Sequence, residues 1–145
     1  DIKNLSTAFY GSDFEVVNLV YPIDGNDLGN SNVVKAILTN KSKIIFFTRS
    51  HVPHEGLQAM RQLGMIGFTH TALAKYTNLQ TTPLEVLESI DMMRLLENDY
   101  EINAVIASSP IIGVDNPGDI KKVELMMAQD EFLNSYQGKY LKSTL

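Results

Sequence analysis

The sequence predicts an α/β fold with a mixed sheet, and three observations lead to that expectation. Apolar runs rich in β-branched residues alternate with segments of helical periodicity, as where residues 102–107 precede residues 116–132. Two apolar runs, residues 33–38 and 43–48, are joined by the short polar segment 39–42, which predicts a hairpin. A hairpin inside an alternating pattern of helices and strands favours a sheet with both parallel and antiparallel pairs.

The amino-terminal part of the chain is expected to begin with a helix and a strand. Residues 2–9 carry apolar side chains at helical spacing. Residues 15–21 (EVVNLVY) are β-branched and are bounded by turn formers, which predicts a strand. Residues 24–31 are a polar loop. Residues 62–68 are apolar but contain two glycines, which weaken them as an isolated strand.

Two helices are expected before the last strand. Residues 69–77 predict a short helix. The clearest helix start lies next, because Thr82 and Glu85 have the spacing of a capping box and Pro83 takes the first helical position. That helix is expected to run over residues 83–97.

An acidic residue, Asp115, follows the last predicted strand. It lies in the segment 113–119 (GVDNPGD), where Asn116 can cap the final helix and Pro117 can begin it. Ligands of open α/β sheets bind at the carboxyl ends of strands, and Mg²⁺ is commonly held there by one or two carboxylates and substrate phosphates. The residues alone leave two interpretations open, a metal ligand or a second capping group.

Other charged residues also leave two interpretations open. Arg49 follows a predicted strand, where its guanidinium could bind a carboxylate or phosphate or could be solvated. Four more recur at a spacing of three on the expected helix: Glu85, Glu88, Asp91 and Arg94. Such a stripe is either a solvated face or one wall of a polar pocket.

Composition limits the classes of protein to consider. With 145 residues, of which 44% are hydrophobic, residues 1–145 are expected to form a single domain. A net charge of −5 argues against nucleic-acid binding. The absence of cysteine excludes disulfides and thiolate chemistry. No apolar run is long enough for a membrane span, so a cytoplasmic protein is expected. The first residue is Asp1, not methionine, which suggests a piece of something longer, although a trimmed tag would also remove the methionine.

In series, several sequence blocks resemble one family, the 3-deoxy-manno-octulosonate cytidylyltransferases or CMP-KDO synthetases. The similarity runs from about residue 15 to residue 132. The blocks are residues 32–35 (NVVK), 47–53 (FTRSHVP), 64–68 (GMIGF), the pattern Pro83-Leu84-Glu85, Glu88, Arg94 and Leu96-Glu97, and residues 113–119.

The resemblance implies a fold and an activity. The fold would be a Rossmann-like nucleotide-diphospho-sugar transferase fold with a mixed sheet. The enzymes join CTP to a KDO-like sugar acid, release pyrophosphate and supply a CMP-sugar for surface polysaccharide such as lipopolysaccharide. They depend on Mg²⁺, are cytoplasmic and are usually dimeric. A homodimer through residues 43–68 is also expected because the hairpin and the glycine-interrupted strand would otherwise leave sheet edges uncovered.

The resemblance also implies residue roles. Asp115 corresponds to a metal-binding aspartate. The positions that correspond to sugar-site residues are Arg49, Gln62, Glu85, Glu88 and Arg94.

The chain departs from the family at specific places. The amino-terminal half, with its glycine-rich and basic nucleotide loop and its first metal aspartate, has no counterpart in this sequence. The fold is therefore expected to be incomplete at the amino terminus, and the chain alone is expected to be inactive. Gln62, Ile66 and Met92 replace polar groups that the family uses near the sugar. Two alternatives stay open: a non-catalytic dimerising or ligand-binding module of the same fold, and a nucleotidyltransferase for another sugar.

Overall fold

The computed structural model describes residues 1–52, 59–109, 114, 117–130 and 133. It divides into two compact units, Asp1–Pro110 and Ile111–Leu145. The first unit contains, in chain order, α1 (Ile2–Thr7), β1 (Val16–Pro22), α2 (Gly25–Leu28), β2 (Lys35–Leu38), β3 (Lys43–Thr48), β4 (Met60–Phe68), α3 (His70–Asn78), α4 (Pro83–Glu88), α5 (Met93–Glu97) and β5 (Ile102–Ile106). The second unit contains α6 (Pro117–Ala128).

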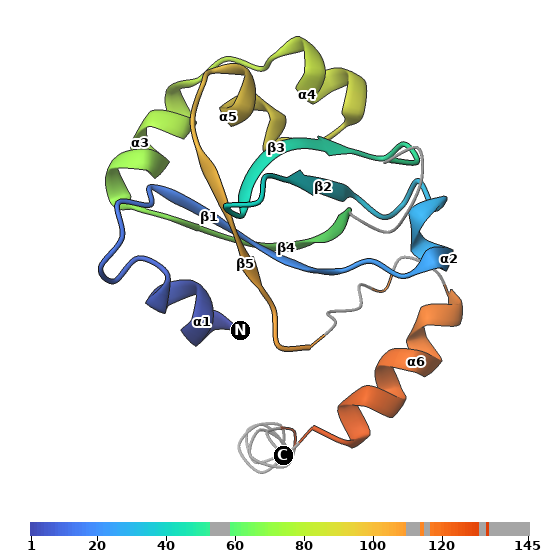
Figure 1. Cartoon of the computed structure of the whole chain (residues 1–145). Helices are drawn as coiled ribbons and strands as arrows, with labels where there is room; N and C mark the ends of the chain where they lie inside the picture. The colour runs from blue at the N-terminus through green and yellow to red at the C-terminus, as the bar shows by residue number, and fades with distance from the viewer. Residues whose placement is uncertain (53–58, 110–113, 115–116, 131–132, 134–145) are drawn as a thin grey trace, which may run out of the picture. The chain divides into compact units, whose positions relative to one another are not determined.

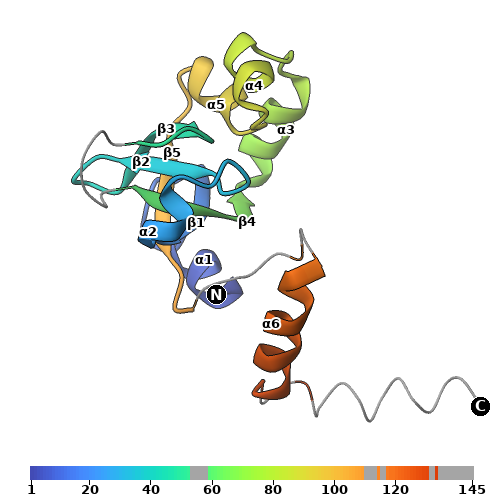
Figure 2. The ribbon, with the colours of Figure 1, turned by 90° about the vertical axis from the view of Figure 1, so that its right-hand side faces the viewer.

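The predicted mixed sheet is confirmed, and it closes on itself. Its strand order is β1-β4-β2-β3-β5, and the circle closes because β5 pairs with β1 in parallel and with β3 antiparallel. β2 and β3 form the predicted hairpin, in which Lys35 lies opposite Thr48. Helices α3, α4 and α5 lie at one end of the sheet and α1 lies at the other (Figures 1 and 2).

The core of the first unit is centred on β1. Val16, Val17, Leu19 and Val20 are all fully buried, so both faces of this strand are covered. This explains why the strand is a continuous β-branched run and not an alternating one. The buried cluster continues onto β3 and onto α5 through side chains such as Phe47, Met93 and Leu95.

β4 is longer than the two glycines of its sequence suggested. It runs for nine residues and pairs with β1 from Phe68 to Met60. A Cβ atom at Gly67 would lie 2.3 Å from Leu5 Cδ2 and 2.9 Å from Phe9 Cε2. Glycine at this position therefore allows the amino-terminal helical segment to pack directly on the strand.

The prediction of one continuous helix over residues 83–97 is wrong. The chain breaks at Ser89, which has φ 55° and ψ 47°, and the segment forms two short helices, α4 and α5. The N–H of Ile90 bonds to the carbonyl of Glu85 at 3.2 Å, which closes α4 with a left-handed cap. The break has a packing reason, since Ile90, Met92, Met93 and Leu95 are all buried and no straight helix could aim them all at the same core.

Three other predictions are refined by the structure. The expected loop 24–31 contains α2, whose N–H groups at Asn26 and Asp27 bond to Asp24 Oδ1. The short helix α3 is found where it was predicted and is capped by Thr69. The final helix begins at Pro117 as expected and ends at Ala128.

Candidate functional site

The candidate site lies where β3 ends beside the corner between α4 and α5. Four of the predicted binding residues are gathered in two contacts there, Arg49 with Glu88 and Glu85 with Arg94. Gln62 lies on β4 and bonds to Asn18, apart from these two contacts. Asp115 lies outside the described residues.

Arg49 connects two loops. Its Nη1 donates to the carbonyl oxygens of Ser31 at 3.1 Å and Asn32 at 3.4 Å, and its Nη2 donates to that of Ser89 at 3.3 Å. The guanidinium is therefore neither freely solvated nor wholly available to a ligand. The Nε–H of Arg49 has no partner within the described part of the chain. One edge of the guanidinium can therefore still donate hydrogen bonds to a carboxylate.

Glu88 fixes the end of β3 to α4. Its Oε2 accepts hydrogen bonds from Thr48 Oγ1 at 2.8 Å and from the backbone N–H of Arg49 at 3.1 Å. Thr48 is buried, so this carboxylate satisfies a hydroxyl that water does not reach. Glu88 Oε1 makes no hydrogen bond among the described residues.

Glu85 and Arg94 form a bidentate ion pair between α4 and α5. Arg94 Nε lies 2.8 Å from Glu85 Oε2, and Arg94 Nη2 lies 2.5 Å from Glu85 Oε1. The guanidinium also lies over the ring of Tyr76, 5.1 Å from its centroid. Donation from Arg94 holds the pKa of Glu85 below its ordinary value, against the opposing effect of burial. The sequence predicted a single stripe of charged residues on one helix. In the structure, two of these residues, Glu85 and Arg94, pair across the break between α4 and α5.

This pair predicts a pH dependence of stability. A carboxylate whose pKa is lowered by folding stabilises the protein above its unfolded pKa of about 4.3, and that contribution is lost as pH falls through the folded pKa. Glu85→Gln should therefore be less stable than the unsubstituted chain near neutral pH, and the two should converge in acid. Urea-unfolding midpoints measured from neutral to acidic pH test this, with Asp91→Asn as the control. A constant difference at every pH would contradict the assignment.

The predicted capping box of α4 is present, but only its Glu85 half makes a full hydrogen bond. Glu85 Oε2 accepts from the Thr82 N–H at 3.2 Å, as predicted. Thr82 Oγ1, however, is buried without a hydrogen-bond partner in the described structure. Glu97 Oε2 replaces it by accepting from the N–H groups of Leu84 at 3.0 Å and Glu85 at 3.3 Å.

Sequence reasoning gave Lys35 no role, yet this residue lies directly behind the site. It is fully buried, and its Nζ donates to the carbonyl oxygens of Asn30 at 2.6 Å and Arg49 at 2.8 Å. Burial lowers the pKa of this amine, while the charge of Asp27 raises it. Lys35 holds together the two loops that Arg49 also connects. No spacing signal marks such a residue, because its partners are backbone oxygens brought close only by the fold.

Three positions at which the resemblance implies polar groups near a sugar contact buried residues in this structure. Gln62 Nε2 donates to Asn18 Oδ1 at 2.8 Å. Ile66 packs against the main core, and Met92 is only 2% exposed. Among the described residues, no group of three histidine, aspartate or glutamate side chains could hold a metal ion.

Arginine, glutamate and backbone groups at the end of a strand can bind a polyhydroxylated acid. The guanidinium suits a carboxylate, and a glutamate accepts hydrogen bonds from hydroxyls.

None of the described helices is long and apolar enough to cross a membrane.

Comparison with known proteins finds the same fold in a solved structure. A solved structure, CMP:2-keto-3-deoxy-manno-octonic acid synthetase in complex with CTP, aligns with a TM-score of 0.80 at 23% identity. The alignment covers 89% of this chain and 56% of that one. No protein-family model matches the chain.

Curated relatives identify the family. The 3-deoxy-manno-octulosonate cytidylyltransferase of Myxococcus xanthus is 30% identical over 131 residues, which are 87% of this chain and 53% of that protein. The enzyme of Rickettsia prowazekii is 32% identical over 111 residues, 77% of this chain and 45% of that protein. The chain belongs to the 3-deoxy-manno-octulosonate cytidylyltransferase family, and it spans about half the length of the curated relatives it matches.

Proposed function

We propose that this chain is the carboxy-terminal, sugar-facing part of a cytidylyltransferase that joins CTP to a KDO-like sugar acid and releases pyrophosphate. The observation that carries the proposal is the match to curated enzymes of that name over 87% of the chain. The chain covers only about half of those enzymes. The proposal therefore includes an amino-terminal half that completes a Rossmann-like fold and binds CTP.

The candidate site supports recognition of the sugar acid. Arg49 would bind the sugar carboxylate through its remaining donors, while Glu88 would accept a hydroxyl through Oε1. The Glu85–Arg94 pair would hold α4 and α5 in place beside the sugar. Gln62 would contribute to sugar binding from β4, where its hydrogen bond to Asn18 holds the side chain.

The reaction is attack of a sugar hydroxyl on the α-phosphate of CTP. Negative charge grows on the phosphoryl oxygens as pyrophosphate leaves. Asp115 would help to hold Mg²⁺, which when bound offsets that charge and orients the reacting groups. The proposal also includes a homodimer through residues 43–68. The closed sheet leaves no unpaired edge strand among the described residues, so the expected uncovered edges do not support the dimer. Its remaining support is the exposed apolar side chain of Ile45 on β3. A cytoplasmic role in surface polysaccharide synthesis is also part of the proposal.

A second candidate is a non-catalytic dimerising or ligand-binding module of the same fold. Met92 favours it, because a buried thioether replaces a polar group that the family places near the sugar.

The decisive experiment measures pyrophosphate release from CTP with KDO and related sugar acids. The protein that contains this chain together with its upstream half should turn over, and this chain alone should not. In the active protein, Asp115→Asn should lower turnover by about 100-fold or more with little change in stability, because the residue would act on transition-state charge. Glu124→Gln, an equal loss of charge on the exposed α6, is the control. No turnover with any sugar acid would favour the non-catalytic module.

A further inference from the structure

Lys35 is a buried lysine whose hydrogen bonds go to backbone oxygens and not to a carboxylate. Its side chain is fully buried, and its Nζ donates to the carbonyl oxygens of Asn30 and Arg49. None of the ion pairs between described residues includes Lys35. A neutral donor could satisfy these two oxygens without the cost of removing a charge from water. The charge of Lys35 therefore needs an explanation beyond its hydrogen bonds.

Arg49 is a second cation of the same cluster, and it also lacks a carboxylate partner among the described residues. Arg49 and Lys35 together bond to the carbonyl oxygens of three consecutive residues, 30–32. Burial and, to a smaller extent, the nearby charge of Arg49 lower the pKa of the Lys35 amine. Arg49 keeps an N–H edge for a ligand, whereas the buried Lys35 cannot contact one.

The carboxylates around these two cations are bonded to other groups. Asp27, whose charge raises the pKa of Lys35, has its Oδ2 2.8 Å from Arg61 Nη1. Glu88 Oε2 accepts from the Thr48 hydroxyl and from the backbone N–H of Arg49, not from the guanidinium. An anionic ligand at the free edge of Arg49 would supply negative charge that the described residues do not place there. A neutral ligand of the same shape would not.

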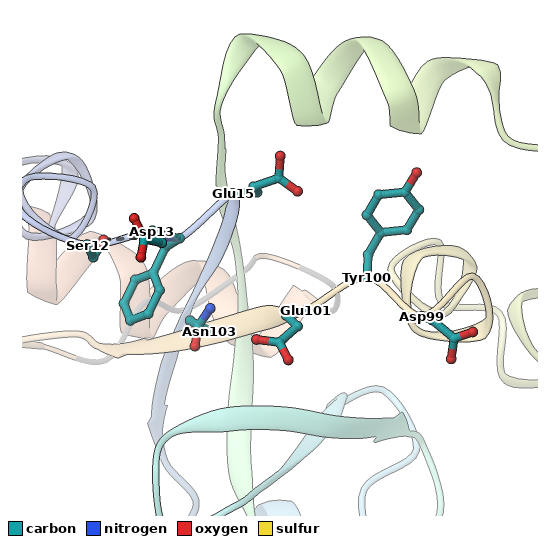
Figure 3. A pocket seen from close by; sticks show the side chains of 8 residues that line it. Ser12, Asp13, Glu15, Asp99, Tyr100, Glu101 and Asn103 are labelled. Atoms are coloured by element: carbon teal, nitrogen blue, oxygen red, sulfur yellow. Dashed lines mark hydrogen bonds between the residues drawn. The ribbon is translucent and has the colours of Figure 1, made fainter.

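A pocket elsewhere in the first unit has the opposite charge. The open pocket of about 690 Å³ before β1 and β5 is lined by four carboxylates and by no lysine or arginine (Figure 3). Such a lining disfavours an anion. The contrast assigns an anionic ligand to the end of β3, and the acidic pocket is a reference region in which no ligand-induced change is expected.

We propose that Lys35 is a positioning and specificity-determining residue, which makes the site prefer a sugar acid to a neutral sugar derivative. This inference rests on the proposed binding of a sugar acid. The hydrogen bonds of Lys35 hold the loop of residues 30–32 and the backbone of Arg49, and thereby fix the guanidinium. Its charge adds to the attraction for the ligand carboxylate, because charges inside a protein are screened less than charges in water.

The test compares the binding of KDO with that of its methyl ester, which keeps the hydroxyl groups and has no charge. Amide NMR of this chain should show shifts in residues 30–32, 48–50 and 88–90 with both ligands and none in residues 12–15. KDO should bind about 10-fold more tightly than the ester.

Lys35→Gln removes the charge and keeps an N–H donor for a carbonyl oxygen. It should lower the ratio of the two affinities by about 5-fold, because only the charged ligand loses attraction. A purely structural role for Lys35 would weaken the binding of acid and ester alike and leave the ratio unchanged.

Two further variants separate charge from stability. Asp27→Asn removes a negative charge that opposes that of Lys35, so it should raise the ratio by about 2-fold, a gain that lost stability cannot produce. Lys41→Gln removes one positive charge from the exposed connection between β2 and β3, and it should leave the ratio unchanged. Thermal melts establish which variants are folded, and Asp27→Asn decides the question if Lys35→Gln is not.

The outcomes distinguish this inference from the proposed function. The role of Lys35 alone is overturned if both ligands bind at the named residues and Lys35→Gln, or Asp27→Asn in its place, leaves the ratio unchanged. An equal effect of Lys41→Gln also overturns it. If neither ligand shifts the amides of residues 30–32 and 88–90, the proposed sugar site is wrong, and the role of Lys35 is rejected with it.

Discussion

Replacement of Asn18 by alanine is expected to lower the free energy of unfolding by about 3 kcal/mol, because several hydrogen bonds inside the sheet would be lost together. Asn18 is fully buried on β1. Its Nδ2 donates to the carbonyls of Leu19 and Leu63, both at 2.9 Å, and its Oδ1 accepts from Gln62 Nε2 at 2.8 Å. These bonds lie where the pairing of β1 and β4 is irregular, between Asn18 and Val20. The side chain thus replaces ladder bonds that the irregular register leaves unmade.

Urea unfolding of Asn18→Ala measures this effect, and Gln62→Ala is the matched control. The control removes only the bond between the two side chains and should cost about 1 kcal/mol. If both variants lost the same stability, the bonds of Asn18 to the backbone would contribute nothing. The comparison also bears on Gln62, since a residue needed only for sugar binding would leave stability unchanged when replaced.

Met92→Gln should lower the free energy of unfolding by about 2 kcal/mol, because it would bury an amide without hydrogen-bond partners. Met92 is 2% exposed and packs in the main core with Met93 and Leu95. Glutamine is the residue that the family resemblance leads one to expect there. Met92→Leu is the matched control and should cost less than about 1.5 kcal/mol, since it keeps the apolar volume.

Chemical denaturation of both Met92 variants tests whether this position belongs to the core or to a polar pocket. Equal stability of the glutamine and leucine variants would contradict a core assignment. It would instead assign Met92 to the wall of a sugar site, where its side chain would affect which sugar acid binds.

The two helix predictions in the middle of the chain show where local signals are sufficient. Thr69 and Pro83 mark the starts of α3 and α4, and both helices begin at those signals. A capping residue and a proline act through contacts within one turn, so a short stretch of sequence contains all that is needed. The hairpin of β2 and β3 is predictable for the same reason, because its four-residue connection brings neighbouring runs together.

The candidate site was only partly predictable. The residue types and the order of Arg49, Glu85, Glu88 and Arg94 mark them as candidates. Their partners do not follow from spacing. Glu88 bonds to the end of β3, 39 to 40 residues away in sequence, and Arg49 bonds to loops on two sides. Such contacts exist only after the sheet has formed, and they convert an apparent stripe on one helix into two separate contacts between elements.

Most of the local elements, the hairpin and the membership of a cytidylyltransferase family could be predicted from the sequence alone. Its β-branched runs, caps and glycines act over a few residues, and the series of family blocks is a property of the chain order alone. The closure of the sheet, the break at Ser89 and the burial of Lys35 could not be predicted and are found only in the folded chain. All three depend on long-range packing: β5 must meet both β1 and β3, and α5 must direct Met93 and Leu95 into the core they share. The free energy of such burial depends on partners far apart in sequence, which no local pattern records.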